Sequence, residues 1–301
     1  QALHRPARPG EPHPQGRRHP LTAAMRLGYQ TNGLQNHRLG DGLRLLAAHG
    51  YEAVGITPDT CHLDPATTTA ADLDATARLL AELRLLPVME TGARFLLDPG
   101  HKHEPTLMTP DPAARQRRFD YCQRAAAMGA RLGAQVLSFW AGIDHRPDAG
   151  SRDRLLDGVR RACALVRAEG LEPSFEPEPG MAVATVADWL ALRADLGSDA
   201  PGLTLDLGHL YAVWEGEPSA VIAAVGPYLR QVHLEDMRRG VHEHLLPGAG
   251  DVDFDGCLNA LQEVGYEGPV CFELARHSHA APAAVAACRD VFLRHRRASG
   301  R

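Results

Sequence analysis

Short apolar runs alternate along the chain with longer segments in which apolar residues recur at helical spacing. Eight runs rich in apolar or β-branched residues lie at 26–29, 52–56, 86–90, 134–139, 171–176, 203–206, 229–234 and 269–274. Helical spacing follows at 40–49, 69–84, 112–132, 151–169, 183–196, 218–225, 254–264 and 281–297. Gly50, Gly133, Gly170 and Gly265 stand just after four of these helices, where a left-handed cap is usual. The pattern predicts eight strand–helix units.

Strict alternation of strand and helix predicts a parallel sheet, because each helix carries the chain back to the edge where the next strand begins. Eight such units between residues 25 and 297 match a (β/α)₈ barrel in number and size. A doubly wound open sheet is the alternative. No Gly-x-Gly-x-x-Gly follows the first strand, however, and no phosphate-binding Gly-x-x-x-x-Gly-Lys loop occurs. We therefore predict a single α/β barrel domain over 25–301.

Residues 1–24 differ from the rest of the chain. They contain five prolines, four arginines and one acidic residue, and they show no apolar period. Such a segment cannot offset the entropy of ordering by burying apolar surface. We predict a disordered tail that ends where the regular pattern begins, at Met25.

Composition narrows the classes of partner. The 301 residues are 44% hydrophobic and only 5% aromatic, and the net charge is −5. An acidic, aromatic-poor chain disfavours nucleic acid as a partner, because nucleic-acid-binding domains usually carry a basic surplus and stacking rings. No run of about 18 apolar residues predicts a membrane span. The six cysteines form no Cys-x-x-Cys pair, which favours free thiols and a cytoplasmic location.

Polar side chains stand where four consecutive predicted strands end: Glu176, Asp206, His233 and Glu273. Each alone has an ordinary explanation as a solvated carboxylate, a hydrogen-bonded imidazole or a helix cap. Together they would meet at the carboxyl-terminal rim of a barrel, where active sites lie. Carboxylates held close together repel, and a divalent cation is the simplest compensation. Three carboxylates and one imidazole favour Mn²⁺, Mg²⁺ or Co²⁺, with Zn²⁺ as an alternative.

Five motifs carry a resemblance to a known family. They are Phe-Glu-Pro-Glu-Pro-Gly (175–180), Leu-Asp-Leu-Gly-His (205–209), Val-His-Leu-Glu-Asp (232–236), Gly-Ala-Gly-Asp-Val-Asp-Phe (248–254) and Phe-Glu-Leu (272–274). The chain resembles the sugar phosphate isomerase/epimerase group of the xylose isomerase-like TIM barrels. That superfamily also contains ketose 3-epimerases, inosose dehydratases and endonuclease IV. The resemblance spans nearly all of 25–297, although its specific motifs lie in the second half.

The resemblance implies a metal-dependent isomerase or epimerase acting on a small sugar or polyol-derived carbonyl compound. In ketose 3-epimerases the residues matching Glu176, Asp206, His233 and Glu273 bind one divalent metal. The two glutamates also act as the acid and base that pass a proton through an enediolate. Glu178 is the alternative to Glu176 as ligand. Dimers and tetramers are common in that family, so a homo-oligomer is an open expectation.

Six further residues are candidates for substrate contact. The resemblance places His209 and Arg239 near the substrate's oxygen atoms, although His209 could instead support Asp206 and Arg239 could be solvated. The long loop after the third strand carries Arg94, Lys102 and His103, which could contact an anionic group or be ordinary surface charges. Trp140 follows the fourth strand and could form an apolar wall against a sugar ring.

Three other functions compete with the isomerase. An inosose-type dehydratase or lyase would share the metal and the enolate, and a metabolite-binding barrel would share only the scaffold. Endonuclease IV binds three zinc ions and uses a histidine after each of its third and fourth strands. Here those strands end at Met89-Glu90-Thr91 and Phe139-Trp140-Ala141, so we do not expect a nuclease. His242 and His244 nevertheless remain candidate ligands of a second metal.

Overall fold

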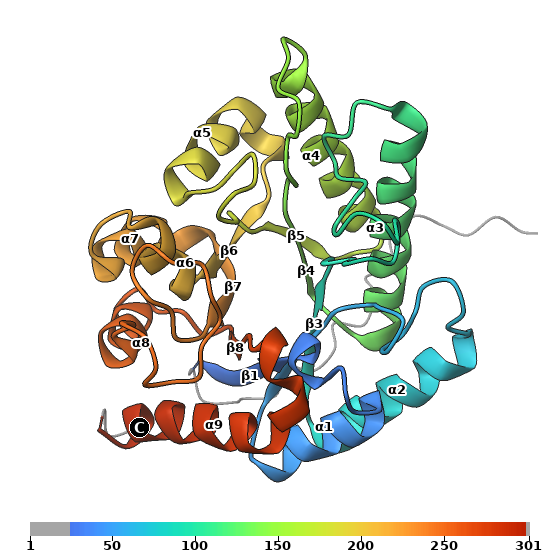
Figure 1. Cartoon of the computed structure of the whole chain (residues 1–301). Coiled ribbons are helices and arrows are strands. Elements are labelled where there is room, and N and C mark those ends of the chain that lie inside the picture. The colour runs from blue at the N-terminus through green and yellow to red at the C-terminus, as the bar shows by residue number, and fades with distance from the viewer. Residues whose placement is uncertain (1–24, 299–301) are drawn as a thin grey trace, which may run out of the picture.

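Eight parallel strands close into a barrel in the computed structural model, which describes residues 25–298 (Figure 1). The strands are β1 (Arg26–Gln30), β2 (Ala53–Ile56), β3 (Leu86–Glu90), β4 (Val136–Phe139), β5 (Glu172–Phe175), β6 (Gly202–Asp206), β7 (Leu229–Leu234) and β8 (Pro269–Phe272). Each strand pairs with the next along the chain, and β8 pairs with β1, with Arg26 opposite Pro269 and Tyr29 opposite Phe272. The predicted (β/α)₈ barrel is confirmed, and the open sheet is excluded.

Helices surround the barrel on its outer side (Figure 1). They are α1 (Leu39–Ala48), α2 (Ala70–Leu83), α3 (Pro112–Leu132), α4 (Ser151–Ala168), α5 (Val186–Leu196), α6 (Leu207–Val213), α7 (Pro218–Val225), α8 (Phe254–Glu263) and α9 (Ala281–Ala298). Gly50, Gly133, Gly170 and Gly265 have φ of 78°, 82°, 80° and 71°, as expected for left-handed helix caps. No helix within 25–298 is long and apolar enough to cross a membrane.

Two helical features differ from the prediction. Helix α5 begins at Val186 rather than near residue 183, because Thr185 and Asp188 form a capping box that fixes its first turn. Helix α6 was not predicted at all. It starts directly after β6, where the side chain of Asp206 accepts a hydrogen bond from the backbone N–H of His209 at 2.9 Å. This cap fixes the positions of Asp206 and His209 relative to each other.

The barrel strands are buried on both faces, which explains why they read as continuous apolar runs. Among the cysteines, Cys61 is exposed and the other five are buried free thiols. Nε2 of His62 donates a hydrogen bond to the carbonyl oxygen of His37 at 2.9 Å, so this pair has a structural contact. The tail predicted over 1–24 lies outside the described residues.

Candidate metal and substrate site

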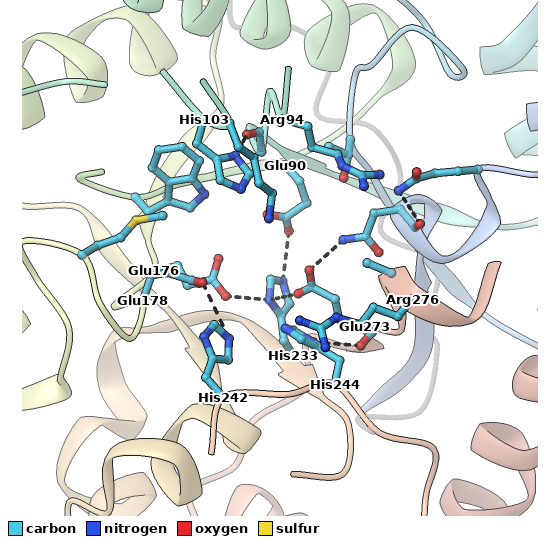
Figure 2. Close-up of a pocket in the computed structure, with 18 residues that line it drawn as sticks. Glu90, Arg94, His103, Glu176, Glu178, His233, His242, His244, Glu273 and Arg276 are labelled. Atoms are coloured by element: carbon cyan, nitrogen blue, oxygen red, sulfur yellow. Dashed lines mark hydrogen bonds and ion pairs between the residues drawn. The ribbon is translucent and has the colours of Figure 1, made fainter. Parts of the chain in front are cut away.

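A cavity of about 340 Å³ opens at the carboxyl ends of the strands (Figure 2). Its lining includes Glu176 after β5, His233 on β7 and Glu273 after β8. Asp206 ends β6 and is fully buried beside them. The parallel register therefore brings the four predicted metal ligands to one rim. The expected convergence of these strand ends is present in the folded chain.

His233 lies at the centre of the carboxylates. Its Nδ1 atom is 2.9 Å from Oε1 of Glu176 and 3.1 Å from Oε2 of Glu273. The same atom is 4.0 Å from Oδ2 of Asp206. One oxygen or nitrogen atom from each of the four residues falls within 4.8 Å of the others. This spacing is compact enough for a single cation to draw the four groups into its coordination sphere.

Burial and close contacts between charged groups shift the pKa values of the residues in this cluster. Burial raises the pKa of Glu176 to about 8, although the charge of His233 acts in the opposite direction. Burial would also raise the pKa of Glu273, but the hydrogen bond and charge of His233 outweigh it and hold that pKa well below its usual range. Burial would lower the pKa of His233, but Glu176 and Glu90 raise it well above its usual value. The carboxylates thus stabilise positive charge at this position.

The donor set fits a divalent cation. Oδ2 of Asp206 is buried and has no hydrogen-bond partner among the described residues, and a buried acceptor left in this way is costly. Three carboxylates with one imidazole make an oxygen-rich set that suits a hard or borderline cation. A cation bound between Asp206, Glu176, Glu273 and His233 would satisfy that oxygen and would replace the proton of His233.

Glu90 is a site residue that the sequence did not reveal. Its Oε1 atom, at the end of β3, lies 3.1 Å from Nε2 of His233, on the side of the ring away from the other carboxylates. Gln30 donates a hydrogen bond to the same oxygen at 3.1 Å, and Gln231 donates another. The available signal is the strand end itself, because Glu90 adds a fourth carboxylate to the three predicted at the same rim.

A second group of possible ligands lies beside the first. The imidazoles of His209, His242 and His244 offer nitrogen atoms within 4.8 Å of one another. The carboxylate of Glu178 is 3.7 Å from Nε2 of His209 and 3.7 Å from Nε2 of His242. Figure 2 shows the side chains of Glu178 and His242 pointing toward each other at the edge of the cavity, which both residues line. Glu178 also offers an oxygen atom within 4.8 Å of ligand atoms of Glu176 and His209, so it borders both groups of possible ligands.

The remaining candidates for substrate contact divide into two sets. Arg94, Lys102, His103 and Trp140 line the cavity. His209 lies behind the residues that line the cavity, and its Nε2 atom is 3.5 Å from Oδ2 of Asp206. This position fits its alternative role, which is to support Asp206. Arg239 is also outside the lining. Its guanidinium group lies 3.3 Å from the centre of the Trp214 ring, so the cation is occupied by an aromatic face rather than directed at the cavity.

Known proteins are similar to this chain in sequence or in fold. The L-ribulose-5-phosphate 3-epimerase UlaE of Escherichia coli K12 is 26% identical over 209 residues, covering 67% of this chain and 72% of UlaE. A D-allulose 3-epimerase from Methylomonas sp., solved with D-allulose, has a TM-score of 0.69 at 18% identity, covering 90% of this chain and 97% of that one.

A further solved structure and a family-level match extend the comparison. The IOLI protein, solved with a binding zinc atom, has a TM-score of 0.72 at 19% identity, with 90% of this chain and 98% of that one covered. The sequence pattern that defines the xylose isomerase-like TIM barrels matches residues 31–295, which is most of the chain. The chain therefore belongs to the family of xylose isomerase-like TIM barrels.

Proposed function

We propose that this protein is a divalent-metal-dependent isomerase or epimerase of a small sugar. The observation that carries the proposal is the placement of two carboxylates, Glu176 directly after β5 and Glu273 directly after β8, with His233 between them. Paired carboxylates can remove a proton from one face of a carbon and return one to the other. The epimerase names of UlaE and of the Methylomonas enzyme support the same class of reaction.

The two glutamates differ in the way that an acid–base pair requires. Asn32 donates a hydrogen bond to Oε1 of Glu273 at 2.7 Å, which fixes the carboxylate and leaves Oε2 directed at His233. Without a bound cation, the pKa of Glu273 is lowered by its hydrogen bonds with His233 and Asn32, whereas burial raises the pKa of Glu176, so the two carboxylates lie in different surroundings. We assign proton abstraction next to a substrate carbonyl and proton return to these two residues.

Glu176, Asp206, His233 and Glu273 would hold the cation. When bound, the cation would supply electrostatic stabilisation for the negative charge that an enediolate places on the substrate's oxygen atoms. Trp140, which is almost fully buried, would present a ring face to the apolar side of the sugar and help to exclude water from the cavity. This assignment leaves the chemistry of proton transfer to the protein's own carboxylates.

Exchange of substrate hydrogen for deuterium in D₂O tests the proposal directly. A panel of ketoses and ketose phosphates is incubated with the metal-loaded protein, and carbon-bound deuterium is read by NMR. Glu176→Gln and Glu273→Gln should each lower exchange about 10²–10⁴-fold. Glu172→Gln, at the opposite end of β5, is the matched control and should not change it. Exchange that persists in Glu273→Gln would overturn the assignment, and a dehydrated product would favour the lyase.

We further propose that His209, His242, His244 and Glu178 form a site for a second divalent cation. Burial lowers the pKa of His209, and burial with the neighbouring imidazoles lowers the pKa of His242 to about 4. These rings are therefore neutral near pH 7 and have lone pairs to offer. Nε2 of His209 is buried and has no hydrogen-bond partner among the described residues.

Metal analysis separates the two cation sites. The purified protein, saturated with Zn²⁺ or Mn²⁺ and freed of excess, should contain about two ions per chain. The double substitution His242→Ala and His244→Ala should leave about one. A wild-type protein that retains a single ion under the same loading would rule out the second site without affecting the first.

A further inference from the structure

Positive side chains line the part of the cavity that β3 and its following loop provide. Arg94 and Lys102 belong to the lining, and Arg118 on α3 lies behind Trp140. Within residues 25–298, none of the three has a carboxylate oxygen within ion-pair distance. The cavity therefore has one side that is rich in carboxylates and another that is rich in unpaired cations. We call Arg94, Lys102 and Arg118 the cationic wall.

Arg118 is the most unusual member of the cationic wall because it is completely buried. Its Nη2 atom donates a hydrogen bond to the carbonyl oxygen of Thr91 at 2.9 Å, while Nε and Nη1 have no partner among the described residues. The guanidinium carbon lies 4.2 Å from the centre of the Trp140 ring. A buried charge without a counter-ion is costly unless something nearby offsets it. The ring face offsets part of that cost, and an anion in the adjacent cavity would offset more.

His103 shows that the three cations share one neighbourhood. The pKa of His103 is lowered to about 4. Burial is the largest cause, and the positive charges of Lys102, Arg118 and Arg94 act in the same direction. The imidazole packs edge-on against Trp140, with ring centres 5.1 Å apart. His103 is therefore neutral near pH 7 and adds no positive charge of its own to the cationic wall.

The backbone that presents these residues adopts an unusual conformation. Ala93, Arg94 and His103 have φ of 53°, 37° and 68°, although none is glycine. Two hydrogen bonds close the loop: the N–H of His103 donates to the carbonyl oxygen of Arg94 at 2.6 Å, and Nδ1 of His103 contacts the carbonyl oxygen of Gly92 at 2.6 Å. Residues held in this region of backbone space cluster at ligand-binding sites. The loop therefore holds Arg94 at the cavity in a backbone conformation that is unfavourable for a residue other than glycine.

We propose that the cationic wall binds an anionic group of the substrate, so that the protein acts on a phosphorylated ketose or a sugar acid rather than on a neutral sugar. The carbonyl end of such a molecule would lie against Glu176, Glu273 and His233, across the cavity from Arg94 (Figure 2). Its charged end would lie against Arg94 and Lys102, which both line the cavity. Arg276, after β8, adds a further cation to the same lining. Phosphate and carboxylate share the acceptor oxygens that guanidinium and ammonium groups bind. This inference rests on the proposed function for the identity of the rest of the molecule.

Binding of inorganic phosphate to the metal-free protein tests the cationic wall without any turnover. EDTA is present during calorimetry, so that a bound cation cannot hold the anion. Arg94→Gln and Lys102→Gln should each weaken phosphate binding about tenfold. Arg146→Gln is the matched control, because Arg146 is exposed on the loop between β4 and α4 and does not line the cavity. Absence of phosphate and acetate binding, or equal binding by the wild type and the Arg94→Gln variant, would overturn the proposal.

Deuterium exchange with matched substrates then identifies the anion. A ketose 5-phosphate, the corresponding sugar acid and the neutral ketose are compared with the metal-loaded protein. One of the two anionic substrates should exceed the neutral ketose in kcat/KM, and Arg94→Gln should reduce that advantage through KM. A neutral ketose that exchanges as well as both anions would refute the anionic substrate and leave the proposed function intact. A protein that binds phosphate but exchanges hydrogen on none of these substrates would support the cationic wall and refute the proposed function.

Discussion

At the scale of single residues, the site depends on how one imidazole is held. His233 has two ring nitrogens with different surroundings: Nδ1 faces Glu176 and Glu273, and Nε2 faces Glu90 at 3.1 Å. A carboxylate at Nε2 favours a proton on that nitrogen and leaves the lone pair of Nδ1 for a cation. Glu90 therefore favours Nδ1 as the nitrogen available to a cation, and the side-chain amide nitrogens of Gln30 and Gln231 lie 2.8 Å from the same Nε2.

Replacing Glu90 with glutamine should weaken divalent-cation binding about 10–100-fold, because the amide keeps the shape of the side chain and loses its charge. Titration of the metal-free protein with Mn²⁺, followed by calorimetry, measures the change. Glu172→Gln, in an ion pair at the far end of the barrel, should bind Mn²⁺ like the wild type. Unchanged affinity in Glu90→Gln would show that Glu90 merely fills space beneath the imidazole.

At the scale of elements, the sequence predicts the strands and the polar residues that follow them, but it does not predict contacts between residues far apart in the chain. The strands are recognisable because buried parallel strands are continuous apolar runs, and Glu176 and Glu273 are recognisable because they follow such runs directly. The role of Glu90 depends on His233, 143 residues further along the chain, so no local pattern contains it. Helix α6 was missed because its only start signal, Asp206, also reads as a strand end.

Gly208, near the start of α6, has no side chain and so leaves space for the buried carboxylate of Glu235. A Cβ atom on Gly208 would lie 2.1 Å from Oε1 and 3.1 Å from Cδ of Glu235, which is completely buried. Gly208→Ala should therefore lower the free energy of unfolding by about 1–3 kcal/mol and disturb the cap at Asp206. Urea denaturation measures the loss.

Gly40 provides the matched control for Gly208, because it is likewise the second residue of a helix. A Cβ atom there would lie 3.2 Å from the tip of the flexible Arg44 side chain and in ordinary van der Waals contact with Leu79, at 3.5 Å. Gly40→Ala should be neutral or should stabilise the protein by about 0.5–1 kcal/mol. Equal effects of the two substitutions would show that helix propensity, rather than the contact with Glu235, governs Gly208.

At the scale of the whole molecule, closure of the barrel assembles the cation site and also strains it. The ends of β5, β6, β7 and β8 meet only because the strands pair in order around the ring. Folding therefore forces Glu176, Asp206 and Glu273 together, and their mutual repulsion lowers the stability of the metal-free protein. A cation that binds these residues binds the folded chain and not the unfolded one, because the unfolded chain scatters the ligands.

Divalent cations should consequently raise the melting temperature. At a cation concentration about 100 times the Kd, the folded state gains about 2.7 kcal/mol, which corresponds to about 5 °C for a domain of this size. Calorimetry of the protein with EDTA and with Mn²⁺, Co²⁺ or Zn²⁺ measures the shift. Asp206→Asn should abolish most of it, because asparagine keeps the helix cap of α6 but removes the charged ligand. If no cation raised the melting temperature of the wild type, the four groups would be a buried polar cluster, and His233 would keep its proton as the compensating charge.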